Sequence, residues 1–556
     1  MSVAPSPDLA LGTFTESGPW VIDPEALPWR GPVEAERTRI RRRLPDLVRP
    51  QRIPPLGRLA LVVGRLGPPL AAWALGARRR GGSASRQDLA RRLRLAAEAL
   101  GPTYIKLGQI IASGEGLFPA ELVTEMRSCR DQVPPETFAA VRSLVEADLG
   151  RPLDEVFARF DRRPLAAASI AQVHAAALHP DEPGGDPIEV VVKVQRPGIG
   201  DLVEADLKVM AFIAPRLVGR IPVAALANPP ALVELFGETI TEELDFRLEA
   251  DNMLDVAAVY AHLGRSPYVV PRPHPTLVTR RVLVMERLSG FSFEDVAGMR
   301  AADIDTTEVV RSGMIGFLEG AMLYGIFHGD LHAGNLFVLP DGRTALLDFG
   351  ITGRMGTKRR KAFLRLLVSA SMNDLRGQLA AIRDLGALPP DADLEAVIRD
   401  LKLDGPVVDP TTLTPEQLTG EIQEVVKGLL GYGARLPKEL MLFIKNLVFL
   451  DSAIATLAPD LDLFSEITHI ATYFATEHGE RIAAEVGVDE SSWTLDMGGV
   501  KAMYGVDDTI EALTHRELQE RREVIAARFA QRERKGRRAR LTHRTRRALE
   551  RRTSKT

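Results

Sequence analysis

The chain has 556 residues, of which 45% are hydrophobic and 26% are charged, as in an ordinary globular protein of about two to four structural units. Its single cysteine, Cys129, excludes an internal disulfide or a multi-cysteine metal site. We expect Cys129 to be a small buried residue and the protein to reside in a reducing compartment. The net charge of −3 hides an acidic body and a basic tail, because the segment from Arg516 to the end carries 16 Lys and Arg against 5 Asp and Glu.

Residues 1–85 are rich in Pro, Gly and Arg, which predicts an irregular region with one or two short helices. The start of the chain lacks the pattern of a secretory signal, so we expect a cytoplasmic location. Residues 59–77 are apolar but are interrupted by Arg65 and Pro68-Pro69, and the uninterrupted part is too short to span a bilayer. This segment either lies on a membrane surface, with Trp73 at the interface and arginines 78–80 on headgroups, or packs as an ordinary helix.

The next part of the chain predicts a helical unit over residues 86–160. Apolar residues recur at helical spacing, and Gly and Pro separate the repeats. Four helices are expected, at Arg86–Leu100, Thr103–Ile111, Ala120–Cys129 and Phe138–Leu149.

After Pro164 the pattern changes to two β-branched runs, Ile188–Val194 and Thr279–Glu286, which predict strands. Helices are expected between them, at 200–217 and 230–261, and through most of the chain after Phe293. The apolar segment 436–457 carries Lys438, Glu439, Lys445 and Asp451, so we expect a buried core helix and not a membrane span. The order predicts an α+β, two-lobed fold with a small mixed-sheet lobe at 161–290, a helical lobe at 291–500 and a tail at 501–556.

One lysine, Lys193, lies in the middle of the apolar strand predicted at 188–194. A buried ammonium is unfavourable unless it is paired or binds an anion, and a strand lysine of this kind contacts nucleotide phosphates in kinases. Its partner is expected among the acids of residues 242–252. On one continuous helix, Glu243 points away from the face shared by Glu242, Asp245 and Glu249.

Two polar motifs follow, His328-Gly-Asp-Leu-His-Ala-Gly-Asn335 and Leu346-Leu-Asp-Phe-Gly350. This spacing is typical of phosphoryl-transfer sites, in which the first Asp, here Asp330, orients a hydroxyl or water. The Asn and the second Asp, here Asn335 and Asp348, hold Mg²⁺ that bridges the phosphates. Short apolar runs on either side of Pro340-Asp-Gly342 predict a hairpin that brings Asp348 next to Asn335.

The loop expected to cover the phosphates is rich in alanine and not in glycine: Ala166, Ala167, Ala168 and Ser169. Because alanine avoids positive φ, the phosphates would be approached differently from those in ordinary kinases. A hinge after the second strand would receive adenine through backbone groups, and Gly290 permits the turn that follows. The predicted nucleotide-binding set therefore also includes Val173, Met285, Glu286 and Leu288.

These motifs together resemble the UbiB/AarF family of atypical kinases, also called the ADCK or coenzyme Q kinase-like family. The resemblance covers about residues 90–463. Its most specific element is Lys106-Leu-Gly-Gln109, a KxGQ motif that ordinary kinases lack. This chain departs from the family in having Asp330-Leu-His-Ala where Asp-Pro-His-Pro is frequent, and in a basic tail where many bacterial relatives have two membrane spans.

The resemblance implies roles for individual residues. Lys193 and Glu249 would form the pair of strand lysine and helix glutamate, Asp330 would occupy the catalytic-loop position, and Asn335 and Asp348 would be magnesium ligands. Lys106 and Gln109 would belong to an N-terminal helical extension that folds over the site. Glu243 and Asp245, the ExD motif, would be the internal partner of that extension.

The function implied is a Mg²⁺-dependent kinase or ATPase that binds ATP or ADP and supports the synthesis or handling of an isoprenoid quinone or prenyl lipid. Expected partners are a quinone precursor, quinone-biosynthesis proteins and an anionic membrane surface, which would be contacted through residues 59–80 and 516–556. Two alternatives stay open: a small-molecule kinase of the aminoglycoside or choline type, which would lack KxGQ, and a non-catalytic scaffold gated by nucleotide. Binding of nucleic acid by the basic tail is a weaker alternative.

Overall fold

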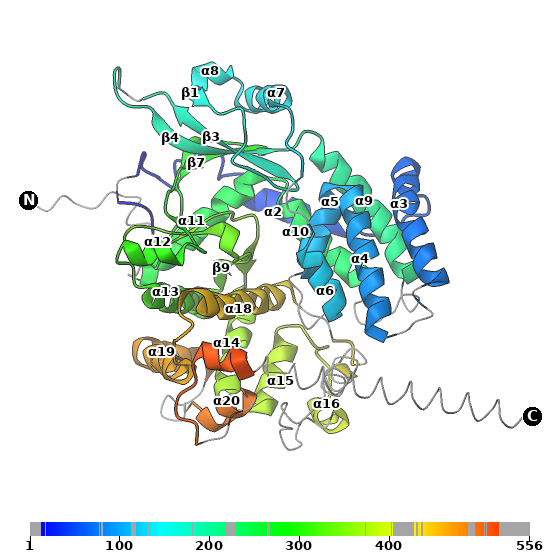
Figure 1. The fold of residues 1–556 in the computed structure, drawn as a ribbon, viewed down its shortest axis with the longest axis vertical. Coiled ribbons are helices and arrows are strands. Elements are labelled where there is room, and N and C mark those ends of the chain that lie inside the picture. Colours follow the sequence, from blue (N-terminus) through cyan, green and yellow to red (C-terminus); the bar gives the residue numbers. More distant parts are fainter. Residues whose placement is uncertain are drawn as a thin grey trace, which may run out of the picture. The chain divides into compact units, whose positions relative to one another are not determined.

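The computed structural model describes residues 13–521 apart from positions 17, 77, 79–81, 113–117, 130–132, 181, 218–228, 264–266, 373, 402, 404–427, 430–431, 435–436, 488–494, 505 and 507–508. The chain divides into two units. Unit 1 comprises Met1–Met355 and Lys438–Phe449, and unit 2 comprises Gly356–Pro437 and Leu450–Thr556 (Figure 1). The greater part of the predicted basic tail, from residue 522 onward, lies outside the described residues.

The N-terminal region is more helical than predicted. The one or two short helices expected there are two longer ones, α2 (Val33–Leu47) and α3 (Leu56–Leu75), and α3 continues through Pro68 and Pro69. Of the two alternatives for this segment, the one that places Trp73 at a membrane interface is wrong, because its side chain is buried against Leu89, Ile111 and Met126. Packing of this face overrides the local preference of proline to end a helix.

The four helices predicted next are confirmed as α4 (Gly82–Leu100), α5 (Pro102–Ala112), α6 (Ala120–Arg127) and α7 (Phe138–Leu149). Gly101, at φ +100°, separates α4 from α5, and Pro102 starts α5 without losing a helical hydrogen bond. Thr137 caps α7 by accepting from the Ala140 amide, and Gly150 ends it in the left-handed conformation. The side chain of Cys129 is buried, as expected.

A six-stranded antiparallel sheet forms the small lobe. Its order is β1-β3-β4-β7-β6, with β2 paired to β3. The strands are β1 (Phe157–Phe160), β2 (Ala166–Ala167), β3 (Ala171–Leu178), β4 (Ile188–Gln195), β6 (Pro273–Val278) and β7 (Val282–Glu286). The apolar side chains of β4 and β7 pack against α7 and the short helix α8 (Leu153–Val156).

The strand predicted at 188–194 is confirmed, but the prediction at 279–286 is too long. Thr279 accepts from the Arg281 and Val282 amides through its hydroxyl, so residues 279–281 turn the chain between β6 and β7. Because β6 begins with Pro273-His-Pro275, its sequence does not look like a strand.

The helical segment predicted at 230–261 is broken. The structure has α9 (Ile199–Leu217), α10 (Pro229–Glu242) and α11 (Phe246–Leu263), so Glu243, Leu244 and Asp245 lie between two helices. The helical phase assumed for the acids of this segment is therefore wrong. The Phe246 amide bonds to the Arg280 carbonyl in the β6–β7 turn and not to a helical carbonyl, which separates α11 from α10.

The predicted hairpin is confirmed as β10 (Leu336–Val338) and β11 (Thr344–Leu346), the centre of a four-stranded sheet in the order β5-β11-β10-β8. Its edges are β5 (Tyr268–Val269) and β8 (Phe291–Ser292). A two-stranded antiparallel pair consists of β9 (Ile326–His328) and β12 (Thr352–Arg354). It pairs His328, where the first motif begins, with Thr352, which lies just after the second motif. The helices of this part are α12 (Val296–Ala301) and α13 (Thr306–Glu319), which continues into a π-turn at Gly320–Tyr324.

Unit 2 is helical in its described residues: α14 (Thr357–Ser371), α15 (Leu375–Asp384), α16 (Leu394–Leu401), α19 (Leu463–Val486) and α20 (Met497–Met503). Helix α18 (Lys438–Leu457) runs through the boundary between the two units. By length and hydropathy it is the one described helix that could cross a membrane, and 44% of that window is buried. Phe443 of α18 stacks on Phe317 of α13, so this part of the helix belongs to the core of unit 1.

Candidate nucleotide and magnesium site

The strand lysine has two acidic partners. Lys193 Nζ lies 2.7 Å from Glu249 Oε1 on α11 and 3.0 Å from Asp348 Oδ1, although these residues are far apart in sequence. Burial disfavours the charged form of Lys193, but Asp348 and Glu249 outweigh burial and raise its pKa above the ordinary range. The lysine is therefore a fixed positive charge.

Glu249 links this lysine to the second motif. Its Oε1 atom also accepts from the Phe349 amide at 3.2 Å. Burial raises the pKa of Glu249 to about 7, an effect that the Lys193 charge opposes. The other acids of the segment have different partners, because Glu242 binds Lys438 and Asp245 binds Arg247. Breaking the helix after Glu242 thus leaves Glu249 as the acid of this segment that meets Lys193.

Asp348 is held in a rare backbone conformation. Its φ is +60°, a left-handed value that non-glycine residues seldom adopt. The Gly350 amide donates to Asp348 Oδ1 at 3.1 Å, and His328 Nε2 lies 2.8 Å from the Asp348 carbonyl oxygen. A side chain at Gly350 would crowd Asp348 Oδ1 and Glu243. Burial opposes the charge of Asp348, but Lys193 and Lys106 lower its pKa to about 2, so the carboxylate is ionised at neutral pH.

The loop that carries Asp330 is fixed to the same hairpin. Asn335 Nδ2 donates to the Asp330 carbonyl at 3.1 Å, and the Leu347 amide donates to the Asn335 carbonyl at 2.9 Å. His328 Nδ1 accepts from the Asp330 amide at 3.1 Å. The structure thus brings Asp330, Asn335 and Asp348 to one place, as their spacing predicts.

Two residues of α18 complete this loop, and sequence reasoning did not assign them to the site. Lys445 Nζ forms an ion pair with Asp330 Oδ1, and Asn446 accepts from the Leu331 amide and donates to the His328 carbonyl. Burial opposes the charge of Asp330, but Lys445 and Lys106 hold its pKa below the ordinary range. The sequence carries the same signal here that pointed to Lys193, a polar residue inside an apolar run. Lys445 and Asn446 interrupt such a run.

The helical extension reaches this site through Lys106. Its Nζ lies 2.8 Å from Glu243 Oε1, and both side chains are almost fully buried. Burial disfavours the lysine charge, but Glu243, Asp330 and Asp348 raise the pKa of Lys106 above the ordinary range. Gln109 follows one helical turn later on α5. Asp245 instead forms an ion pair with Arg247 at 2.6 Å.

The alanine-rich loop pairs with β3, which lies between it and the lysine strand β4. Ala166 and Ala167 form β2, Val173 lies opposite Lys193 in the ladder, and Ser169 is buried. Arg196 donates to the Ala168 carbonyl at 3.0 Å and also to the Pro134 carbonyl, so the loop is tied to the segment before α7.

The expected hinge lies at the end of β7, where Met285 and Glu286 occupy the last two positions. The Glu286 carboxylate accepts from the Arg272 amide at 3.1 Å and from the Thr15 hydroxyl, so its side chain is engaged with the N-terminal segment. Leu288 packs against the cluster of Val269, Leu339 and Ala345. Gly290 is required because a Cβ there would lie 2.5 Å from the Val338 carbonyl oxygen.

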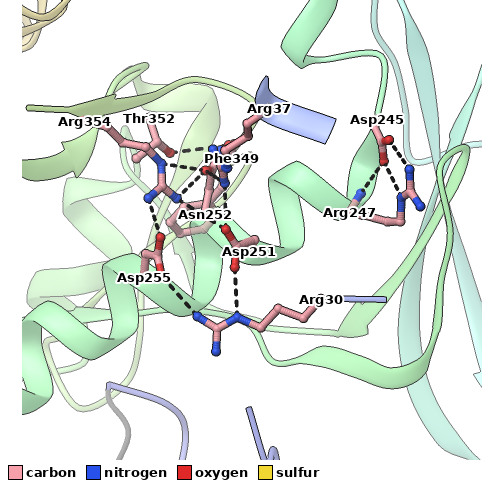
Figure 2. A network of polar contacts seen from close by, with 10 residues as sticks. All are labelled: Arg30, Arg37, Asp245, Arg247, Asp251, Asn252, Asp255, Phe349, Thr352 and Arg354. Atoms are coloured by element: carbon pink, nitrogen blue, oxygen red, sulfur yellow. Dashed lines mark hydrogen bonds and ion pairs between the residues drawn. The ribbon is translucent and has the colours of Figure 1, made fainter. Parts of the chain in front are cut away.

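A further polar network supports the backbone next to Asp348 (Figure 2). Asn252 Nδ2 donates to the Phe349 carbonyl at 2.8 Å, and its Oδ1 accepts from Arg37 of α2 and Arg354 of β12. Arg30 and Arg37 also bind Asp251, at 3.0 and 2.7 Å. Sequence reasoning missed this network, because its members lie in three distant segments.

We expect Asn252→Ala to lower the free energy of unfolding by about 2 kcal/mol, because it removes one buried donor and leaves two guanidinium groups without this acceptor. Chemical denaturation would measure the change. Asn252→Asp keeps an acceptor for the arginines but loses the donor to the Phe349 carbonyl and adds a negative charge, so it tests whether charge on the arginine side can replace that donor. An Ala variant as stable as the wild type would show that the network does not support this segment.

The comparisons with known proteins agree on one family. A model of the ABC1 atypical kinase-like domain matches residues 128–381. An uncharacterized protein of Mycobacterium tuberculosis is 37% identical over 390 residues, which cover 68% of this chain and 76% of the relative. An uncharacterized aarF domain-containing protein kinase of Arabidopsis thaliana, described as chloroplastic, is 33% identical over 398 residues, covering 67% and 73% of the two chains.

A probable protein kinase UbiB of Aeromonas hydrophila is 32% identical over 397 residues, covering 68% of this chain and 69% of the relative. The chain belongs to the UbiB/AarF family of atypical kinases. The α+β, kinase-like fold expected for a UbiB/AarF protein is confirmed. The family model begins at residue 128, so α5 and its Lys106 lie before the matched region.

Proposed function

We propose that this UbiB/AarF protein is a Mg²⁺-dependent enzyme that binds ATP or ADP and either hydrolyses ATP or transfers its phosphoryl group to a small lipid-derived acceptor. The observation that carries the proposal is the joint placement of Lys193, Glu249 and Asp348 within 3.0 Å contacts, beside Asp330 and Asn335. Charge complementarity of this kind positions a nucleotide and stabilises a transferring phosphoryl group.

The donor atoms of the site fit Mg²⁺. Asp348 Oδ1 faces Lys193 and the Gly350 amide, and among the described residues no hydrogen bond or ion pair engages its second carboxylate oxygen. Asn335 donates through Nδ2, which leaves its amide oxygen to act as a ligand. Mg²⁺ prefers such hard oxygens and is commonly held by one or two protein groups together with phosphates and water. Asn335 and Asp348 would hold the ion, which supplies charge neutralisation at the phosphates when it is bound.

The chain's own residues have distinct proposed tasks. Lys193 contacts the α and β phosphates, and Glu249 keeps this lysine in place. Asp330, ionised under the influence of Lys445, orients the attacking hydroxyl or water and is a weak base because its pKa is low. Lys445 fixes the orientation of this carboxylate and adds positive charge where negative charge develops.

The extension limits which acceptors can react. Lys106 pairs with Glu243 and acts electrostatically on Asp330 and Asp348, so α5 adjoins the catalytic loop. A folded protein substrate would have to displace α5, whereas water or a small molecule would not. This supports ATP hydrolysis, or an acceptor related to isoprenoid quinones or other prenyl lipids, as the family resemblance implies.

We also propose how the chain is organised into regions and where the protein is located. We divide the chain into a region at 1–85, an extension at 86–160, lobes at 161–290 and 291–500, and a tail at 501–556. We also propose a peripheral location on the inner face of the cell membrane, with quinone-biosynthesis proteins as partners.

The test is ATP hydrolysis by the purified full chain with Mg²⁺, with and without anionic vesicles that contain a prenyl lipid. We expect hydrolysis that rises with the vesicles and is lost in a Lys193→Met/Asp348→Asn double variant. Nucleotide binding that depends on these residues, but without turnover under any condition, would favour a scaffold gated by nucleotide. Wild-type activity in the double variant would overturn the assignment of the site.

A further inference from the structure

Helix α3 exposes an unusually apolar side. Its 20 residues contain two charged side chains, Arg58 and Arg65. The exposed fractions of its large side chains reach 66% at Leu56, 54% at Val63 and 72% at Leu75. Surface helices of globular proteins normally direct polar residues toward water, so this side of α3 lacks the composition of a solvated face.

The opposite side of α3 is fixed to the protein. Trp73 is buried and donates from Nε1 to the Ser85 carbonyl of α4 at 3.0 Å. Arg58 binds Asp206 of α9 through Nε at 2.5 Å. Figure 1 shows α3 at the right-hand edge of the view, with α4 and α9 on one side of it only. These contacts set the rotation of the helix, so the exposed side cannot turn inward without breaking them.

The exposed apolar surface extends along the whole helix. Projected at 100° per residue, the exposed positions of α3 form one arc around the helix axis. The arc has Val63 and Leu56 at one edge and Leu61 and Ala72 at the other, and it covers about half of the helix circumference. Eleven large hydrophobic side chains are exposed among the described residues, and five of them lie within 53–75: Ile53, Leu56, Leu61, Val63 and Leu75. A contiguous patch of this kind marks a site of interaction.

The charge around α3 indicates the partner. The 41 residues from Leu47 to Gln87 contain eight arginines and no acid. Arg65 is exposed beside the apolar side, and Arg49 and Arg52 are exposed just before the helix. A second copy of the same face would oppose these arginines with like charge, whereas an anionic lipid surface would attract them and also accept the apolar side chains.

We propose that α3 lies flat on an anionic lipid surface, with its exposed apolar side among the acyl chains and the exposed Arg49, Arg52 and Arg65 on the headgroups. The buried face of Trp73 shares a cluster with Ile111 of α5, the helix that carries Lys106. Lipid contact at α3 is thus one packing layer away from the extension that reaches the nucleotide site. This inference deepens the proposed membrane role, but its test needs no nucleotide and so does not depend on turnover.

The experiment is sedimentation of the full chain with vesicles of phosphatidylcholine and phosphatidylglycerol in equal parts, compared with phosphatidylcholine alone. The variant Leu61→Glu/Val63→Glu places two carboxylates on the exposed side, and we expect it to lower vesicle binding about tenfold or more. Leu95→Glu is the matched control, since Leu95 is an exposed leucine of α4 at 48%. Added salt should weaken wild-type binding.

A direct probe uses the single buried cysteine. Because Cys129 is buried, Leu61→Cys would react selectively with an environment-sensitive fluorophore, which should shift to the blue on the anionic vesicles. Equal vesicle binding by the wild type and the double Glu variant would overturn the proposal, as would no binding by the wild type. A wild-type dimer that the double Glu variant converts to monomer, without vesicle binding, would assign this face to a second copy instead.

Discussion

Replacing Asp348 with Asn is expected to weaken Mg²⁺-dependent nucleotide binding about 100-fold or more, which corresponds to about 2.7 kcal/mol. The substitution removes the charged oxygen proposed to hold the ion and the partner that lies 3.0 Å from Lys193 Nζ. Asn tolerates the left-handed backbone that Asp348 adopts at φ +60°, so the local fold should survive. The loss should therefore reflect the ligand and not the backbone.

The measurement is thermal stabilisation by ATP with Mg²⁺, compared with ATP and a chelator. The matched control is Asp341→Asn, because Asp341 lies in the turn of the same hairpin and binds Arg343 at the surface. We expect the control to behave as the wild type. If Mg²⁺ and ATP stabilise the Asp348→Asn variant as much as the wild type, Asp348 is not a metal ligand.

The second large effect is expected from Lys445→Met, which should lower ATP turnover about 100-fold to 1,000-fold by removing a preorganised positive charge at the catalytic loop. Without Lys445, the Asp330 carboxylate would keep the influence of Lys106 but lose the partner that holds it in place. The pKa of Asp330 should then rise toward its ordinary value, because burial would be opposed by Lys106 without Lys445. The acid limb of the pH–rate profile should accordingly move to higher pH, because Asp330 would lose its charge at a higher pH than in the wild type.

The matched control for this variant is Lys438→Met on the same helix. Lys438 is similarly buried but binds Glu242 and Glu238, away from Asp330. We expect Lys438→Met to affect stability and not the pH profile, and Lys445→Arg to restore part of the turnover. A Lys445→Met enzyme with wild-type turnover and an unchanged acid limb would remove Lys445 from the proposed mechanism.

Some features of the site could be predicted from the sequence because they depend on residues that are close together in the chain. The spacing of Asp330 and Asn335 and the turn at 340–342 predict a loop and a hairpin, and the structure has both. Lys193 was recognisable because a charged side chain inside a buried apolar strand needs a partner. Helical phase could not identify which acid pairs with Lys193. The helix ends at Glu242 and the next begins at Phe246, so the continuous helix that the phase argument assumed does not exist.

In the N-terminal region, too, tertiary packing overrides what the local sequence predicts. Its prolines and glycines predict irregular chain with one or two short helices, but α3 is 20 residues long because it gains more from packing Val62 and Trp73 than it loses at Pro68 and Pro69. Likewise, Arg37 gives no sign in the sequence that it will meet Asn252, which lies more than 200 residues later. Contacts of this kind depend on the positions of α2, α11 and β12 together.

The sequence by itself determined the class of site and its lysine, carboxylate and amide groups, because burial of charge and motif spacing restrict what those residues can do. The residue pattern left several acids open as the partner of Lys193, and the family resemblance implied Glu249 for Lys193 and the ExD motif for the extension. Only the tertiary structure decided that Lys106 would meet Glu243 and not Asp245, and that Lys445 would hold Asp330. The physical reason is that a buried charge requires a partner but does not specify which one. Its identity is fixed by the packing of helices and strands that lie far apart along the chain.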